Sequence, residues 1–202
     1  MAKNGDTFVL KTSLGNEYEA RCIIIAGGTL PRLLGIKGEK EFRGRGVSYC
    51  ATCDAGFFRG KTVGVVGGGD TAVKEADYLS RFADKVIVFH RRDAFRASKV
   101  VAAKVDSNSK VQTRYNTVVE EIYGNFTVEG VHTRNTVTGD NEDIPLDGVF
   151  VFAGYIPNTE LYKELLILDE NGNIITDNEM HTSCKGIFAA GDIRNTTLRQ
   201  VI

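Results

Sequence analysis

The chain has 202 residues and a net charge of −1, because 25 basic side chains nearly balance 26 acidic ones. This balance excludes binding of a nucleic acid or an anionic membrane through overall charge, so we expect neither as a partner. Apolar runs such as residues 22–26 are far shorter than the roughly 20 residues that span a bilayer. The N-terminus has no apolar signal segment, which predicts a cytoplasmic location, where four cysteines do not form a disulfide framework.

Two strands are predicted near the N-terminus, at residues 7–12 and 17–26, with residues 13–16 as the hairpin turn between them. The second strand ends in an unbroken apolar run, which is typical of a strand in a parallel sheet that is covered on both faces. A charged connection with several glycines follows at residues 35–46 and indicates a crossing between domains. We therefore place a domain boundary near residue 40.

The middle of the chain predicts a βαβ unit. Short apolar strands at residues 62–66 and 85–90 flank a helix at residues 71–82, and three glycines form the first turn. The remaining predicted elements are a helix at about residues 97–105, an antiparallel meander at 111–138, a buried strand at 148–154, a short helix at 158–165 and a final strand at 186–190. Strands that alternate with helices predict an α/β fold with a Rossmann-like domain.

The turn of this βαβ unit fits the dinucleotide-binding pattern G-x-G-x-x-A, with Gly67, Gly69 and Ala72 at the fixed positions. The first glycine permits the tight turn, the second lets the backbone approach a pyrophosphate, and the small third residue allows close packing of helix on strand. The alternative is a glycine-rich loop that binds nothing. The position of the motif between an apolar strand and a helix favours nucleotide binding.

Basic residues follow the second strand of the unit, at His90, Arg91, Arg92 and Arg96. An NAD-binding unit places a carboxylate near this position, where it accepts hydrogen bonds from a ribose 2′-hydroxyl. Guanidinium groups instead offer paired donors to a 2′-phosphate, so the sequence predicts NADPH in preference to NADH. The alternative is a solvated basic turn, which the nearby glycine motif disfavours.

Cys50 and Cys53 form a C-x-x-C pair, whose spacing lets the two sulfurs join and makes one of them a better nucleophile. The main alternative is half of a zinc site, but the other cysteines and histidines supply no second pair of ligands. Asp54 follows directly and could either protonate a leaving thiolate or cap the next turn. A dithiol beside a nucleotide-binding strand indicates a redox relay, for which a flavin is the usual intermediate cofactor.

Together these motifs resemble the low-molecular-weight thioredoxin reductases. The resemblance rests on GVSYCATCD at residues 46–54, VVGGGDTA at residues 65–72 and HRRDAFRA at residues 90–97. It continues with GYIPNT at residues 154–159 and GIFAAGD at residues 186–192, followed by Arg199-Gln200-Val201. Nearly the whole chain is covered, in the order and spacing of the family.

The resemblance implies that hydride passes from NADPH to FAD and then to the disulfide of Cys50 and Cys53. Cys53 is then the sulfur that faces the flavin, Cys50 the thiol that attacks a partner's disulfide, and Asp54 the proton donor. The nucleotide-binding residues that it implies are Gly67, Gly69, Asp70 and Thr71 at the pyrophosphate, with His90, Arg91, Arg92 and Arg96 at the 2′-phosphate. The flavin-binding residues that it implies are Gly191, Asp192, Arg199, Gln200 and Val201.

The family pattern also implies a domain organisation. Residues 1–40 would be a partial segment of an FAD domain, residues 41–152 an NADPH-binding domain that carries the dithiol, and residues 153–202 the return segment of the FAD domain. Residues 35–46 and the stretch near Gly154 would be the hinges between them. Nothing before Cys22 resembles the family's first G-x-G-x-x-G unit, and its closing helix is missing after Ile202, so both ends look cut.

The partner that the family implies is thioredoxin or a similar small dithiol protein, and the full-length form is expected to be a homodimer. Two other readings stay open at this point. One is a related reductase that serves a peroxidase, because the motifs do not describe the surface that selects the partner. The other is an NADPH-binding module without bound FAD and without activity.

Overall fold

The computed structural model describes residues 2–5 and 7–196 and divides the chain into two compact units. The central unit comprises residues 31–154, and the terminal unit comprises the residues up to 30 together with those from 155 onward. The first division thus lies at residue 30, whereas the sequence suggested residue 40. Leu34, Ile36 and Phe42 pack into the core of the central unit, which is why residues 35–46 belong to it.

A five-stranded parallel sheet forms the middle layer of the central unit. Its strands, in spatial order, are β6 (Val47–Ser48), β13 (Gly148–Val151), β7 (Thr62–Val66), β8 (Lys85–Phe89) and β9 (Val111–Arg114). Apart from Thr62 and Lys85 at the starts of β7 and β8, the central strands are apolar, as expected for a sheet that is covered on both faces. Because all five strands run the same way, their carboxyl ends share one edge of the sheet.

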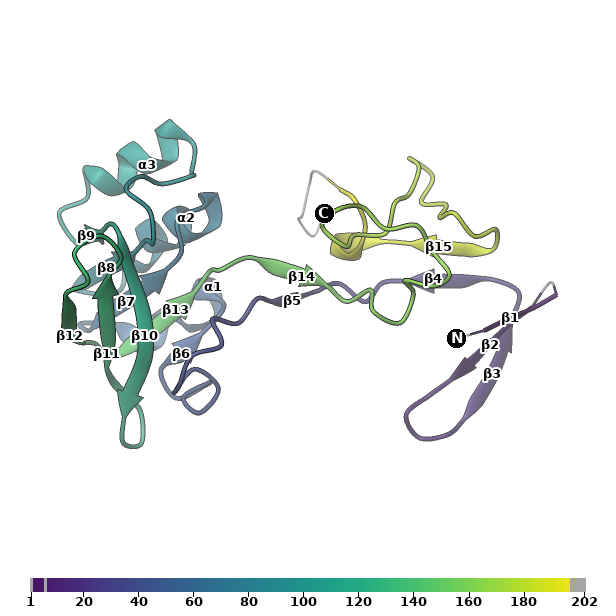
Figure 1. Cartoon of the computed structure of the whole chain (residues 1–202), viewed down its shortest axis with the longest axis horizontal. Helices are drawn as coiled ribbons and strands as arrows, with labels where there is room; N and C mark the ends of the chain where they lie inside the picture. Colours follow the sequence, from purple (N-terminus) through teal and green to yellow (C-terminus); the bar gives the residue numbers. More distant parts are fainter. Residues whose placement is uncertain (1, 6, 197–202) are drawn as a thin grey trace. The chain divides into compact units, whose positions relative to one another are not determined.

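Helices cover one face of this sheet (Figure 1). They are α1 (Ala51–Asp54), the 3-10 helix η1 (Ala55–Phe58), α2 (Asp70–Leu79) and α3 (Lys99–Asp106). α2 buries one stripe of side chains at helical spacing, formed by Ala72, Val73, Ala76 and Leu79. The predicted βαβ unit at residues 62–90 is therefore confirmed, with the helix beginning one residue earlier than predicted and ending three residues earlier.

A three-stranded antiparallel sheet covers the other face (Figure 1). It consists of β10 (Thr117–Gly124), β11 (Val128–Asn135) and β12 (Asn141–Pro145). The meander was predicted to begin at residue 111, which is wrong, because residues 111–114 form β9 and pair in parallel with β8. This strand follows α3, so it completes a second βαβ crossing, and only its partner distinguishes it from a meander strand.

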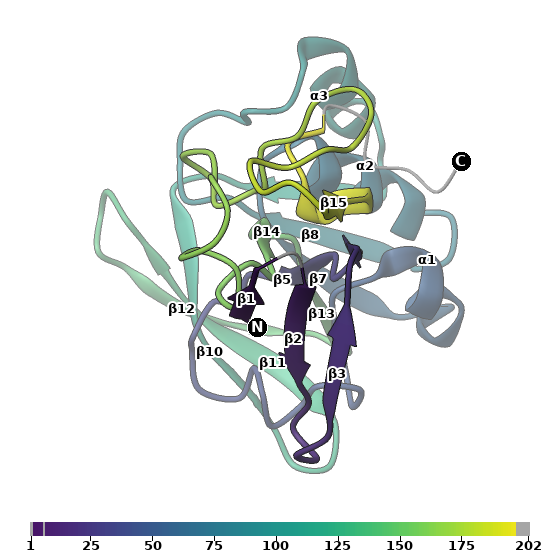
Figure 2. The ribbon, with the colours of Figure 1, turned by 90° about the vertical axis from the view of Figure 1, so that its right-hand side faces the viewer.

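The terminal unit begins with an antiparallel sheet of β1 (Ala2–Asn4), β2 (Thr7–Lys11) and β3 (Glu17–Ala20), which stands in the foreground of Figure 2. The predicted hairpin turn at residues 13–16 is confirmed, since β2 and β3 pair across it. The predicted strand at residues 17–26 is two strands instead. β4 (Ile23–Ile25) leaves the hairpin and pairs in parallel with β15 (Ile187–Ala189).

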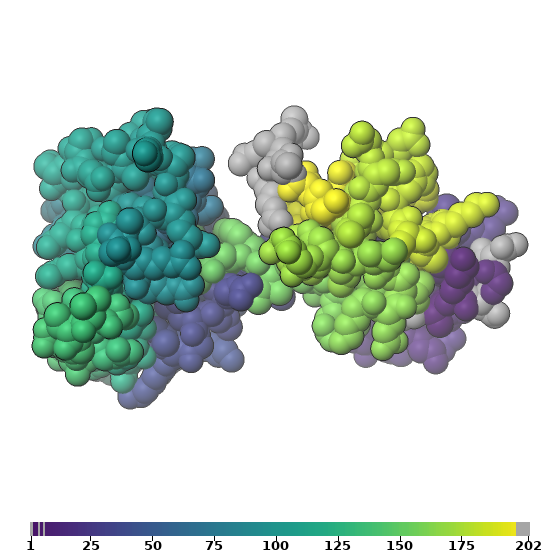
Figure 3. Space-filling model, turned by 45° about the horizontal axis from the view of Figure 1, so that its top comes forward, coloured from purple at the N-terminus to yellow at the C-terminus, as the bar shows by residue number. Residues whose placement is uncertain are grey.

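A small core holds the terminal unit together and joins segments that are far apart in the sequence. Figure 3 shows the purple N-terminal residues against the yellow-green residues that follow residue 155. The buried members are Phe8, Ile25, Leu166, Ile174, Ile187, Ala189 and Ile193. In contrast to the strands of the central sheet, β4 leaves Ile24 72% exposed, so the expected cover on both faces is present on one face only.

The last part of the chain departs from the predicted pattern. Residues 158–165 form successive turns rather than a helix, with Tyr162 N–H donating to the carbonyl of Thr159. The segment still packs Tyr162 and Leu165 against the core of the terminal unit, so the apolar spacing that predicted a helix reports this packing instead. β5 (Thr29–Pro31) pairs with β14 (Tyr155–Pro157), and the 3-10 helix η2 (Gly191–Ile193) follows β15. In the described part of the chain, no helix is long and apolar enough to cross a membrane.

Candidate functional site

The residues that the sequence singles out in the central unit follow three strands of one parallel sheet. The dithiol turn (residues 48–54) begins with the last residue of β6, the glycine loop (residues 67–69) follows β7, and the arginine turn (residues 90–98) follows β8. Since the strands are parallel, all three segments lie at the same carboxyl edge, where open α/β sheets bind their ligands. The glycine loop and the arginine turn leave adjacent strands, whereas β13 separates β6 from β7.

The three glycines of the loop differ in what surrounds them. A Cβ atom on Gly67 would lie 2.7 Å from the Cβ of Ala72, and one on Gly68 would lie 2.1 Å from Nδ1 of His90. A Cβ on Gly69 would meet no atom within 4 Å. Gly67 and Gly68 are therefore required by the protein's own packing. Gly69 borders open space at the start of α2, where a ligand could approach the backbone.

Backbone hydrogen bonds join the arginine turn directly to the glycine loop. The backbone N–H groups of Arg96 and Ala97 donate to the carbonyl of Gly68, at 2.8 and 3.2 Å. Ser98 N–H donates to Oδ1 of Asp70 at 2.9 Å, which ties the start of α3 to the first turn of α2. The structure thus brings the predicted arginines and the predicted glycines together. Arg91, Arg92 and Arg96 are all exposed at this position.

His90 lies behind the turn and is only 5% exposed. Its Nε2 is 3.0 Å from the carbonyl oxygen of Ala94, and its ring packs at 5.6 Å from the ring of Phe95. Burial lowers the pKa of His90, and the charges of Arg92, Arg96 and Arg91 lower it further, against the raising effect of the Ala94 hydrogen bond. A neutral, buried imidazole supports the loop from inside. Its predicted place beside a phosphate stays a prediction.

The dithiol turn holds a disulfide between Cys50 and Cys53, with their Cα atoms 5.3 Å apart. Cys50 is the N-cap of α1, and its sulfur lies 3.2 Å from the backbone N–H of Cys53, which donates to it. The hydroxyl oxygen of Thr52 lies 3.4 Å from the same sulfur. Cys50 is half-buried and Cys53 is exposed, so the two sulfurs differ in their access to solvent.

Ser48 is a polar residue of this turn that the sequence reasoning missed as a site residue. It is 6% exposed, and its hydroxyl donates to Oδ2 of Asp54 at 2.6 Å. The hydroxyl oxygen of Ser48 in turn accepts a hydrogen bond from the N–H of Cys50 at 3.1 Å. Asp54 makes no capping hydrogen bond to η1, so the capping alternative for this residue is wrong. A serine at the buried end of an apolar strand was the available signal.

Glu39 anchors the residue that precedes the disulfide. Its carboxylate is fully buried and accepts hydrogen bonds from the N–H groups of Leu34 and Gly35 and from the hydroxyl of Tyr49, at 2.8 to 2.9 Å. Burial raises the pKa of Tyr49 to about 12, and the bond to Glu39 contributes in the same direction. Tyr49 therefore remains a neutral donor over the whole physiological range and holds Cys50 in place.

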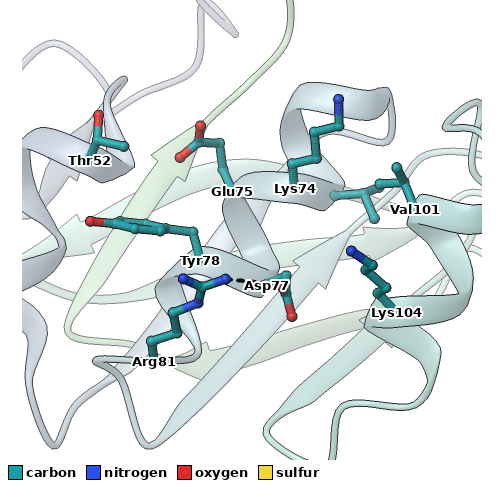
Figure 4. Close-up of a pocket in the computed structure, with 9 residues that line it drawn as sticks. Thr52, Lys74, Glu75, Asp77, Tyr78, Arg81, Val101 and Lys104 are labelled. Atoms are coloured by element: carbon teal, nitrogen blue, oxygen red, sulfur yellow. Dashed lines mark ion pairs between the residues drawn. The ribbon is translucent and has the colours of Figure 1, made fainter.

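A cavity of about 370 Å³ lies between α1, α2 and α3, as Figure 4 shows. Thr52 from the dithiol turn shares its lining with Glu75 and Tyr78 of α2. Among the described residues Oε2 of Glu75 has no hydrogen-bond partner, and burial raises the pKa of this carboxyl. The cavity shows that the dithiol turn and the helix that follows the glycine loop are direct neighbours.

Residues 2–202 match the family model described as pyridine nucleotide-disulphide oxidoreductase. The chain belongs to this family. It is 50% identical over 192 residues to a thioredoxin reductase of Peptoclostridium acidaminophilum, and this match covers 92% of the chain and 61% of that relative. It is 47% identical over 200 residues to a thioredoxin reductase of Listeria innocua, with 98% and 63% covered.

Solved structures agree with these relatives. The structure of the chain resembles the crystal structure of Lactococcus lactis thioredoxin reductase, with a TM-score of 0.85 and 41% identity over 98% of this chain and 65% of that one. The resemblance to thioredoxin reductases that the sequence predicted is confirmed. The chain spans about three fifths of the length of the curated relatives that it matches first.

Two of the five residues that the sequence predicted to bind a flavin lie in the described part of the terminal unit. Gly191 and Asp192 follow the carboxyl end of β15 and form part of η2. Gly191 has φ +74°, a conformation that favours glycine, and a Cβ there would meet no atom within 4 Å. This open turn after a parallel strand has room for a ligand. The other predicted members, Arg199, Gln200 and Val201, lie outside the described residues.

Proposed function

We propose that the chain is the NADPH-binding and dithiol-bearing part of an NADPH-dependent thioredoxin-disulfide reductase. One observation carries the proposal. The arginine turn is bonded through its backbone to the carbonyl of Gly68, at the same edge of the sheet as the disulfide of Cys50 and Cys53. The loop that would bind phosphate and the sulfur pair that would accept electrons thus lie at one edge of the same sheet. The relatives described as thioredoxin reductases support the same activity.

NADPH fits the residues that are present. The open backbone at Gly69 and the N-terminus of the ten-residue α2 suit its pyrophosphate, with Asp70 and Thr71 in the first turn. Arg91, Arg92 and Arg96 suit its 2′-phosphate, because each offers charged donors in a planar fork. His90 supports this turn from behind, and Asp70 supports it through Ser98.

FAD is the second cofactor of the proposal. Gly191 and Asp192 would contact it, together with Arg199, Gln200 and Val201, so the terminal unit would be part of an FAD domain and the central unit the NADPH domain. A bound flavin supplies a carrier that accepts a hydride and passes two electrons to a disulfide. The two places where the chain passes between its units, near residues 30 and 154, would serve as hinges.

The two sulfurs have separate roles in the proposal. Exposed Cys53 faces the flavin, and after reduction Cys50 attacks the disulfide of thioredoxin or a similar small dithiol protein. This attack forms a mixed disulfide, and the Cys53 thiolate then attacks Cys50, releases the partner as a dithiol and restores the Cys50–Cys53 disulfide. Asp54 exchanges protons with the sulfurs. The full-length protein would act as a homodimer in the cytoplasm.

Nucleotide preference tests the first half of the proposal. We expect the chain to bind NADPH more tightly than NADH, and Arg92→Ala or Arg96→Ala to weaken NADPH binding about tenfold without changing NADH binding. Arg59→Ala is the matched control, since this exposed arginine lies over the ring of Phe82 and away from the loop. Titration followed by nicotinamide fluorescence measures both affinities. Equal affinity of the unmodified chain for the two nucleotides would contradict the proposal.

Sulfur reduction tests the second half. With FAD and NADPH supplied, the chain should reduce the disulfide of thioredoxin, and Cys50→Ser or Cys53→Ser should abolish this while leaving NADPH binding intact. Cys184→Ser, at a free half-buried cysteine of the terminal unit, is the control. A protein that binds NADPH but holds no flavin and reduces nothing would instead be the nucleotide-binding module that the sequence left open.

A further inference from the structure

The hydroxyl of Ser48 stands at the centre of a short hydrogen-bonded chain in the dithiol turn. The N–H of Cys50 donates to its oxygen at 3.1 Å, and its own proton can reach Oδ2 of Asp54 at 2.6 Å or the carbonyl of Cys50 at 3.2 Å. A serine has only one proton to donate. The shorter distance matches an O–H donor that faces a carboxylate, so the proton goes to Asp54.

The place of Ser48 in the fold makes this arrangement rigid. Ser48 is the last residue of β6, where it pairs with Phe150 of β13 in the parallel sheet, and it is 6% exposed. Water therefore has little access to compete for the hydroxyl. The hydrogen bond engages Oδ2 of Asp54 and leaves its other oxygen, Oδ1, free of the serine.

We propose that Ser48 is a positioning residue, which holds Oδ2 of Asp54 so that Oδ1 exchanges protons with the sulfurs of the dithiol turn. The inference rests on the proposed function of the disulfide. When a thiolate attacks one sulfur, the Cys50–Cys53 bond breaks, and the leaving sulfur takes its electron pair and a proton from the Asp54 carboxyl. On reoxidation the thiol returns this proton to the carboxylate, so that protons and electrons balance.

The rate of disulfide reduction by dithiothreitol tests the inference without NADPH or flavin. The ratio of variant to wild-type rates at each pH cancels the ionisation of the reductant. Ser48→Ala removes a hydrogen bond to the carboxylate, so the midpoint of the pH–rate profile should move to higher pH. Ser48→Thr, which keeps the hydroxyl, should retain the wild-type midpoint.

Two controls separate positioning from a general structural effect. Ser80→Ala removes an equally buried hydroxyl from the end of α2, and its midpoint should not move. In the Asp54→Asn background the pH step should vanish, and adding Ser48→Ala should change nothing further. A uniform loss of rate at every pH, or an equal effect of Ser48→Ala with and without Asp54, would overturn the inference.

A second measurement needs no change at Ser48 and remains decisive if Ser48→Ala does not fold. The amide proton of Cys50 is bonded to the serine oxygen, so its NMR shift in the wild-type chain should show a step at the midpoint of the rate profile. The step should be absent in Asp54→Asn. No step in the wild-type chain overturns the proposal. These experiments use no nucleotide, so a negative result in them contradicts only the role of Ser48. A failure to prefer NADPH would instead contradict the proposed function.

Discussion

The glycine loop and the dithiol turn both follow buried parallel strands of one sheet, yet they keep their shapes in opposite ways. The glycine loop depends on side chains that are missing, because Ala72 and the ring of His90 occupy the space that a Cβ would need. The dithiol turn depends on side chains that are present, since Ser48, Glu39 and Tyr49 hydrogen-bond around it. Added atoms should therefore destabilise the glycine loop, and removed polar atoms should destabilise the dithiol turn.

The largest expected effect comes from Gly68→Ala. A methyl group would lie 2.1 Å from the imidazole of His90, which cannot retreat because it is buried. We expect the free energy of unfolding to fall by about 3 kcal/mol, a typical cost of overpacking. Urea denaturation measures the change.

Gly69→Ala is the matched control for the glycine loop. Its Cβ would meet no protein atom, so stability should be unchanged, while affinity for NADPH falls because the methyl group blocks the approach of a phosphate. Equal losses of stability in both variants would show that the loop is not shaped by packing against His90.

The next largest effect is expected for Glu39→Ala, which removes the acceptor of Tyr49 in the dithiol turn. Three donors would lose their buried acceptor, with an expected cost of about 2 kcal/mol in the free energy of unfolding. Glu41→Ala, at an exposed neighbour, should cost little. A similar loss in both variants would contradict the role of Glu39.

The phenol of Tyr49 sharpens this prediction at high pH. Its folded-state pKa of about 12 lies above the ordinary value of 10.0. Burial and the bond to Glu39 both favour the neutral phenol, so this contribution to stability is fully present below about pH 10 and is lost as the pH rises through about 12. Tyr49→Phe should remove this part of the pH dependence from unfolding curves.

A smaller effect is expected at Asp70, the residue that follows the glycine loop. Asp70→Ala breaks the bond to Ser98 N–H and should cost about 1 kcal/mol of stability, while loosening the arginine turn and reducing the preference for NADPH over NADH. Asp70→Asn keeps an acceptor oxygen and should retain both. If Asp70→Ala leaves the nucleotide preference unchanged, Ser98 does not hold the arginines in place.

The smallest effect is expected at Glu75, in the cavity between the two regions. Burial raises its folded-state pKa, so the fold loses stability as the pH rises and the carboxyl ionises. Glu75→Gln should stabilise the protein by less than about 1 kcal/mol at about pH 7.5, since the side chain is partly open to solvent. This stability difference should disappear at about pH 4, where the carboxyl is protonated. A larger difference at about pH 4 than at about pH 7.5 would contradict the prediction.

The βαβ unit, its glycine turn and the disulfide could be predicted because each depends on residues close together in the chain. Apolar runs and glycines mark β7, α2 and β8, and the spacing of Cys50 and Cys53 suffices for a bond. Partners distant in the sequence could not be predicted. β4 pairs with β15, although 161 residues separate Ile25 from Ile187 in the chain. β9 pairs in parallel with β8, and its own residues do not distinguish this partner from a meander strand.

The sequence alone therefore determined the fold class, the family resemblance and the residue types available for nucleotide and sulfur chemistry. Tertiary structure alone decided that Gly68 is required by His90, that the arginine turn is bonded to the glycine loop, and that Ser48 engages Asp54. The physical reason is that propensity and spacing act between neighbours along the chain. Close packing and hydrogen bonding act between whichever groups the folded sheet brings to one edge.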